Sequence, residues 1–312
     1  MAFAEQDMVD IYNAVGLPEQ CRTEDQVGHL LSAVACTFLD TEVTYGHNPM
    51  EQERAEWFGT QNYNDGKFVP TLLRLYEGND AALHGKIDGL AHLAGIFVAR
   101  QLLGESAFSF SQFIRREVTM LPAGFALDDR VVHLDRPVQS VVEYGPGMHG
   151  KHYIDTQAHT LGQRKEPFTY YALTIGPVVG SVLGHYAAVK LGESNPYFKF
   201  NRDGMAAGSD RLLQEQWRTG TQGFADIVIA SKVHRADPRE IAHAISNAHS
   251  VLRPNGALLL RGPLAESRHD GREVSIETML EYADNAGFDP NRAEAGEFEM
   301  RTMRGLAAVL YK

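Results

Sequence analysis

An apolar segment that runs directly into closely spaced glycines restricts most strongly how this chain folds. Residues 141–150 read Val-Val-Glu-Tyr-Gly-Pro-Gly-Met-His-Gly. Glycine has no Cβ, so the backbone at such positions can turn tightly and approach a ligand closely. The spacing of Gly145, Gly147 and Gly150 also satisfies the dinucleotide-binding pattern G-x-G-x-x-G. The segment therefore predicts a buried strand that is followed by a ligand-binding turn.

Short apolar runs alternate with helical patterns from Pro137 onward. The runs lie at 138–144, 168–175, 197–200, 224–230 and 257–260, and helical patterns lie at 178–191 and 237–252. Asp237 and Pro238 supply a cap and a first-turn proline for the second of these helices. The alternation predicts an α/β fold with a doubly wound, mostly parallel sheet. Ligands bind such sheets outside the carboxyl ends of the strands.

The residues before this region read as successive helices. Apolar residues recur at helical spacing between positions 83 and 102, and Gly104 ends the pattern. A polar connection further upstream carries aromatic side chains, among them Tyr45 and Tyr63. We therefore expect residues 1–136 to form an all-helical N-terminal cap or lid with a connector, and residues 137–312 to form the α/β domain.

The composition of the chain excludes several classes of partner. Its 312 residues include 40 acidic and 29 basic ones, a formal net charge of −11, and the basic residues are dispersed. Because nucleic-acid binding needs a basic footprint, no nucleic acid is expected as a partner. No apolar stretch approaches the roughly 20 residues that span a bilayer, so no membrane is expected either. Two cysteines, no apparent signal peptide and no metal-ligand cluster predict a cytoplasmic protein without a metal.

The acid in the glycine segment favours a cationic ligand. A carboxylate two residues before the first glycine would repel a pyrophosphate, whereas it suits a positively charged group. Further along, the apolar run 224–230 is followed by a helix and by Leu-Arg-Pro-Asn-Gly at 252–256. Together with the glycine segment and a late helix at 275–287, these features resemble the class I S-adenosylmethionine (SAM)-dependent methyltransferases. The resemblance covers residues 137–312 and implies a seven-stranded Rossmann-like sheet; a nicotinamide-binding Rossmann domain is the alternative.

The resemblance also implies that SAM is the cofactor, and it assigns roles to individual positions. Glu143 would lie near the ammonium and ribose side of SAM, and the turn at Gly145 and Gly147 would follow its methionine and sugar. The remaining positions that match the family's pattern are Asp203 for the adenine amino group, Gly204 beside the ring, and Ser231 at the mouth of the fourth strand.

One position departs from the family's pattern. The second strand of these enzymes ends in an acid that holds both ribose hydroxyls, and here Thr174 occupies that place. A hydroxyl can share one hydrogen bond but cannot hold two hydroxyls as a carboxylate does. Another residue therefore holds the ribose, or SAM binds less tightly, or the protein does not turn over.

Three hypotheses for function follow from this reading. The first is methyl transfer to a small-molecule acceptor, with His149 or His234 as general base and with Tyr45 and Tyr63 lining the acceptor pocket under the helical lid. The second is attack on Cγ of SAM, either by its own amine, as in azetidine-2-carboxylate synthases, or by aminocarboxypropyl transfer. The third is a catalytically silent SAM-binding or interaction module. In that case the N-terminal helices would serve a homodimer.

Overall fold

The computed structural model describes most of the chain beyond residue 136. The described ranges are 136–146, 150–173, 177–201, 204–219, 223–230, 236–267, 273–300 and 303–312, with positions 89, 91, 92, 94–96, 99, 103, 134 and 233. The chain divides into two compact units, Met1–Ile114 with Gly176–His185, and Arg115–Ile175 with Tyr186–Lys312. The second unit contains the whole sheet.

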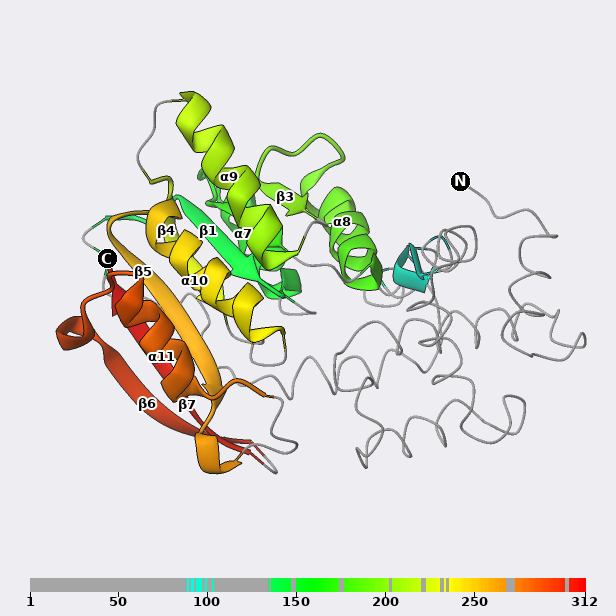
Figure 1. Cartoon of the computed structure of the whole chain (residues 1–312). Coiled ribbons are helices and arrows are strands. Elements are labelled where there is room, and N and C mark those ends of the chain that lie inside the picture. The colour runs from blue at the N-terminus through cyan, green and yellow to red at the C-terminus, as the bar shows by residue number, and fades with distance from the viewer. Residues whose placement is uncertain are drawn as a thin grey trace, which may run out of the picture. The chain divides into compact units, whose positions relative to one another are not determined.

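Seven strands form one sheet in the order β3-β2-β1-β4-β5-β7-β6 (Figure 1). The strands β1 to β5 pair in parallel, and β7 pairs antiparallel with both β5 and β6. This confirms the predicted α/β class: a doubly wound, seven-stranded, mostly parallel Rossmann-like sheet like that of class I methyltransferases. The strands are β1 (Ser140–Tyr144), β2 (Thr169–Leu173), β3 (Phe198–Asn201), β4 (Ala225–Ala230), β5 (Leu252–Pro263), β6 (Glu294–Met300) and β7 (Met303–Tyr311).

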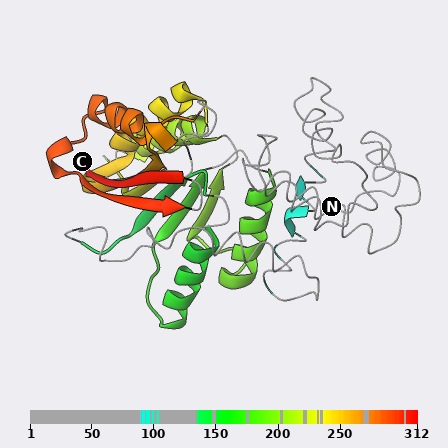
Figure 2. The same cartoon turned by 90° about the horizontal axis from the view of Figure 1, so that it is seen from below.

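Helices cover both faces of the sheet, as Figure 2 shows for α10 and α11 on one face and α7 on the other. The last residues of α8 are linked to α7 by a hydrogen bond, in which the hydroxyl of Tyr186 donates to Oδ1 of Asp155 at 2.7 Å. The helices α9, α10 and α11 cover a core formed with one side of the strands. The helices are α7 (Gly150–Gly162), α8 (Pro177–Leu191), α9 (Met205–Thr219), α10 (Pro238–Val251) and α11 (Ile276–Asn285).

Local sequence explains several of these elements. Both faces of β1 and β4 are buried, which is why their sequences are almost continuously apolar. The helix α10 begins as predicted: the side chain of Asp237 accepts from the N–H of Arg239, and Pro238 is the first helical residue. In the N-terminal region, the described positions from 89 to 103 are helical, as the periodicity predicts. The predicted cap as a whole lies outside the described residues.

The strand β5 begins earlier than its apolar run indicates. It starts at Leu252 and includes the Arg-Pro-Asn-Gly residues that precede the apolar run at 257–260. Leu252 pairs with Ala225 and Ala257 pairs with Ile227, so the register shifts between these pairs. Asn255 has a φ of 59° within this irregularity. A bulge of this kind lets a strand absorb extra residues, including a proline that a regular central strand would exclude.

Candidate functional site

The strand order indicates the carboxyl end of β1 as the place where a ligand would bind. The chain continues from β1 to β2 and β3 on one side, whereas β4 and β5 lie on the other side. The strand order therefore reverses at β1, and ligands bind doubly wound sheets outside the carboxyl ends of the strands at such a point. The glycine segment begins at the same end of β1.

Gly145 makes the first turn of this segment with a φ of 60°. Its N–H donates to the carbonyl oxygen of Leu173 at 2.9 Å, so the turn is tied to the end of β2. A Cβ placed at Gly145 would meet no atom of the described residues within 4 Å. The backbone conformation therefore favours glycine at this position, and the described residues leave space beside the turn.

Glu143, the acid of the glycine segment, is buried on the α7 face of the sheet at 1 % exposure. Its Oε2 accepts a hydrogen bond of 2.5 Å from the hydroxyl of Tyr170 in β2. The ring of Tyr153 from α7 lies 5.0 Å from the ring of Tyr170. Burial and the charge of Glu143 raise the pKa of both tyrosines well above the ordinary value, so Tyr170 stays a hydrogen-bond donor.

Tyr144 points to the opposite face of the sheet and is fully buried among residues of α9 and α10. Burial raises its pKa, as does the charge of Asp210 to a smaller extent. On this face Asn247 of α10 donates to Oγ of Ser209 at 3.0 Å and to Oδ1 of Asp210 at 2.8 Å. These bonds hold α9 against α10 beside the carboxyl end of β1.

The start of α9 packs closely against the end of β2. Gly204 precedes the helix with a φ of 84°, and Gly208 lies in its first turns. A Cβ at Gly208 would come within 2.5 Å of Cδ2 of Leu173. The carboxyl ends of β1 and β2 and the start of α9 are therefore in direct contact.

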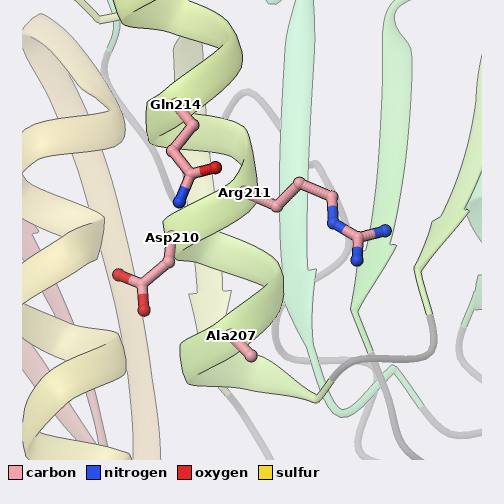
Figure 3. Close-up of a pocket in the computed structure, with 4 residues that line it drawn as sticks. All are labelled: Ala207, Asp210, Arg211 and Gln214. Carbon is pink, nitrogen blue, oxygen red and sulfur yellow. The ribbon is translucent and has the colours of Figure 1, made fainter.

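Two cavities border α9. One of about 510 Å³ is lined by Ala207, Asp210, Arg211 and Gln214, all on the helix, and Figure 3 shows Asp210 and Arg211 directed to opposite sides of it. The other, of about 340 Å³, lies between α9 and the strands β2 and β3, and Leu173 and Asn201 line it at the carboxyl ends of these strands. Neither described lining includes Glu143 or Gly145. The second cavity nevertheless reaches the carboxyl ends of the strands, which is the side of the sheet where the candidate site lies.

The structure describes three of the residues that the sequence analysis selected. It brings Glu143 and Gly145 together at the end of β1, and it places Gly204 before α9. The other selected residues lie outside the described residues; they are Tyr45, Tyr63, Gly147, His149, Thr174, Asp203, Ser231 and His234.

The sequence analysis missed Tyr170 and Tyr153. Tyr170 is registered opposite Val141, which is two positions before Glu143 on the same face of the sheet. No sequence motif carries this relationship, because it depends on the pairing of β1 with β2.

The described residues can also be compared with the requirements of a metal site and of a membrane-spanning helix. Among them, no group of three or more His, Cys, Asp or Glu side chains could hold a metal ion. No helix within the same residues is long and apolar enough to cross a bilayer.

Several solved structures of SAM-dependent methyltransferases resemble this fold. A 1,6-didemethyltoxoflavin-N1-methyltransferase from Burkholderia thailandensis matches 69% of this chain and 87% of its own, with 17% identity and a TM-score of 0.43. The N-methyltransferase NodS from Bradyrhizobium japonicum matches 64% of this chain and 97% of its own, with 14% identity and a TM-score of 0.39.

A protein with a different activity also resembles the chain. The [4+2]-cyclase SpnF matches 72% of this chain and 95% of its own, with 14% identity and a TM-score of 0.43. The chain spans 60% of the length of another match, from Nostoc punctiforme. No protein-family model matches the sequence, and no curated protein is significantly similar to it.

Proposed function

We propose that the protein is a SAM-dependent enzyme that transfers a methyl group to a small-molecule acceptor. The observation that carries the proposal is the buried carboxylate of Glu143 beside the open turn at Gly145, where the strand order reverses. A buried carboxylate attracts a cationic ligand and repels a pyrophosphate. The antiparallel β7 also distinguishes this sheet from the dinucleotide-binding order 3-2-1-4-5-6.

The residues at the strand ends would hold the cofactor as the family resemblance implies. Glu143 would bind the ammonium side of SAM, and Gly145 with Gly147 would follow its methionine and sugar. The other proposed contacts are Asp203 and Gly204 around the adenine, Thr174 at the ribose, and Ser231 at the end of β4. When bound, SAM supplies a methyl group on a positively charged sulfur, and a nucleophilic acceptor can take this group.

The protein's own contribution is alignment and proton transfer. Holding two reactants in a reactive geometry is worth about 7–11 kcal/mol in intramolecular analogies. His149 or His234 would accept the proton of the acceptor, which adds roughly 10²- to 10⁴-fold in rate. Tyr45 and Tyr63 would line the acceptor pocket under the helical lid, which would also exclude water.

Calorimetry with the full chain tests cofactor binding. We expect SAM and S-adenosylhomocysteine to bind, and Glu143→Gln to weaken both by roughly 10-fold or more, because it removes a charge-assisted contact without changing the shape of the side chain. Glu281→Gln, which neutralises an exposed acid on α11, is the matched control. Unchanged affinity in Glu143→Gln would overturn the assignment of this residue.

Product analysis tests the reaction. Incubation with SAM and a panel of small nucleophiles should give S-adenosylhomocysteine only when an acceptor is present. Methylthioadenosine with a cyclic amino acid, formed from SAM alone, would instead identify attack on Cγ. Binding without turnover under any condition would indicate a silent SAM-binding module, and no binding would exclude both enzymatic functions.

A further inference from the structure

Arg261 is a buried cation at the carboxyl end of β5. Because β4 and β5 are parallel, this end lies on the same edge of the sheet as the carboxyl end of β1. The side chain is 8% exposed, and burial lowers the pKa of Arg261 to about 10. It therefore remains charged near neutral pH in surroundings that hold little water.

The alternation of β5 determines which face Arg261 occupies. Leu258 and Leu260 belong to the core under α10 and α11, and a Cβ at Gly262 would meet Cε of Met279 in α11 at 2.2 Å. Successive side chains of a strand point to opposite faces. Arg261 therefore lies on the other face, which is the face that α7 covers at β1.

Glu143 lies on the same face, two strands away. The register aligns Glu143 with Ile229 in β4 and Ile229 with Leu259 in β5, and Arg261 is two positions nearer the carboxyl edge. Ideal strand spacing and rise separate the Cα atoms of Glu143 and Arg261 by about 12 Å. A glutamate and an arginine across such a gap can reach the opposite charges of one small ligand.

The chemistry of the arginine indicates what this ligand carries. Its planar guanidinium matches a carboxylate with two parallel hydrogen bonds, and a desolvated cation gains most from such a partner. Two other arginines, which lie near the amino ends of the strands, are more exposed than Arg261. Arg136 and Arg253 are 31% and 28% exposed, and both pair with Asp226 at 3.0 and 3.2 Å.

We propose that Arg261 binds a carboxylate of the ligand held at the carboxyl ends of the strands. Glu143 would bind the cationic group of the same ligand. The inference rests on the proposed function and names the chemistry of its site: an amino-acid-like group lies between β1 and β5. The carboxylate has two sources, the methionine end of SAM or a carboxylate-bearing acceptor.

Calorimetry with two nucleosides distinguishes the sources. S-Adenosylhomocysteine has the amino-acid group, and 5′-methylthioadenosine lacks it. If Arg261 binds the cofactor's carboxylate, Arg261→Gln weakens S-adenosylhomocysteine by roughly 10- to 100-fold, the effect of a charged hydrogen bond, and leaves methylthioadenosine unchanged. Arg261→Lys keeps the charge but not the two parallel hydrogen bonds of the guanidinium, so it should give an intermediate loss of affinity for S-adenosylhomocysteine.

Small carboxylates test the second source. If Arg261 binds an acceptor, Arg261→Gln leaves the affinity for S-adenosylhomocysteine unchanged. Benzoate or acetate is then titrated, with detection by NMR, into protein saturated with S-adenosylhomocysteine, and it binds the wild type but not the variant. The inference is overturned if wild type and variant bind all these probes alike. A wild type that binds neither nucleoside would refute the proposed function instead.

Two further variants separate binding from folding. Arg253→Gln removes an arginine from the other end of β5, so it should lower the stability without changing ligand affinity. Glu273, which is 3% exposed and lies beyond β5 in the chain, is one of the buried acids among the described residues, and we use it to test a purely structural pairing of Arg261. Strong coupling between Arg261→Gln and Glu273→Gln in the free energy of unfolding, with unchanged ligand affinities, would overturn the inference.

Discussion

The hydroxyl of Tyr170 donates a hydrogen bond of 2.5 Å to Oε2 of Glu143, and both side chains are buried. The bond joins β2 to β1 immediately before the turn at Gly145. It offsets part of the cost of burying a carboxylate and fixes the position of Oε2. The acid that carries the proposed function is therefore positioned by the sheet itself.

Tyr170→Phe should destabilise the protein by about 1–3 kcal/mol, because it removes a hydrogen bond from a buried carboxylate. Urea unfolding measures this change in free energy. Tyr171→Phe, one position along β2 and on the opposite face, should change the stability by less than about 0.5 kcal/mol. Equal effects of the two variants would show that the bond to Glu143 adds nothing.

Gly145→Ala should weaken both folding and ligand binding. An L-residue at a φ of 60° costs about 1–2 kcal/mol, and the new methyl group would occupy space beside the turn that the described residues leave free for a ligand. Gly184→Ala is the control, because Gly184 lies inside α8 and no atom of the described residues would lie within 4 Å of the new Cβ. This control should stabilise the protein by up to about 1 kcal/mol. Thermal unfolding and calorimetry with S-adenosylhomocysteine measure both effects, and normal binding by Gly145→Ala would contradict the prediction.

The sequence predicted those parts of the fold whose signals are local. Continuous apolar runs identified β1 and β4, and Asp237 with Pro238 identified the start of α10. The helix α7 was missed because few of its residues are apolar, with Tyr153 and Ile154 as its buried hydrophobic side chains.

The residues of the candidate site also differ in whether a local sequence signal identifies them. Glu143 and Gly145 belong to a short motif and could be selected from the sequence alone. Tyr170 could not, since its position depends on the β1–β2 register, and Arg261 reads as one residue within an apolar strand. The face of the sheet on which Arg261 lies follows from the structure, because α11 covers the neighbouring Gly262 on the other face.

A buried carboxylate near the amino ends of the strands, away from the candidate site, should be important for stability alone. Asp226 is fully buried and pairs with Arg136 and Arg253, and it accepts from the N–H groups of Gln139 and Ser140 at 2.7 and 3.0 Å. Breaking such a buried pair costs about 3–5 kcal/mol, so Asp226→Asn should lower the free energy of unfolding by an amount of this order.

Ligand affinity should be unaffected in the Asp226→Asn protein that remains folded, because this cluster and the candidate site lie at opposite ends of β4. Asp289→Asn, at an exposed position, is the matched control for charge removal. A large loss of S-adenosylhomocysteine affinity in folded Asp226→Asn would refute a purely structural role.

His249 should make the stability of the protein depend on pH in mildly acidic solution. Burial, with a smaller contribution from the charge of Lys312, lowers the pKa of His249 below 6.5, and its ring lies 5.1 Å from that of Phe288. As the pH falls through 6.5, the unfolded chain therefore binds a proton before the native protein does. The free energy of unfolding must then decrease with acidification until the native histidine is also protonated. His249→Gln should lose less stability than the wild type between about pH 8 and pH 5, a window that brackets the ordinary histidine pKa. Urea unfolding across this range measures the difference, and identical pH slopes for the two proteins would exclude His249 as its cause.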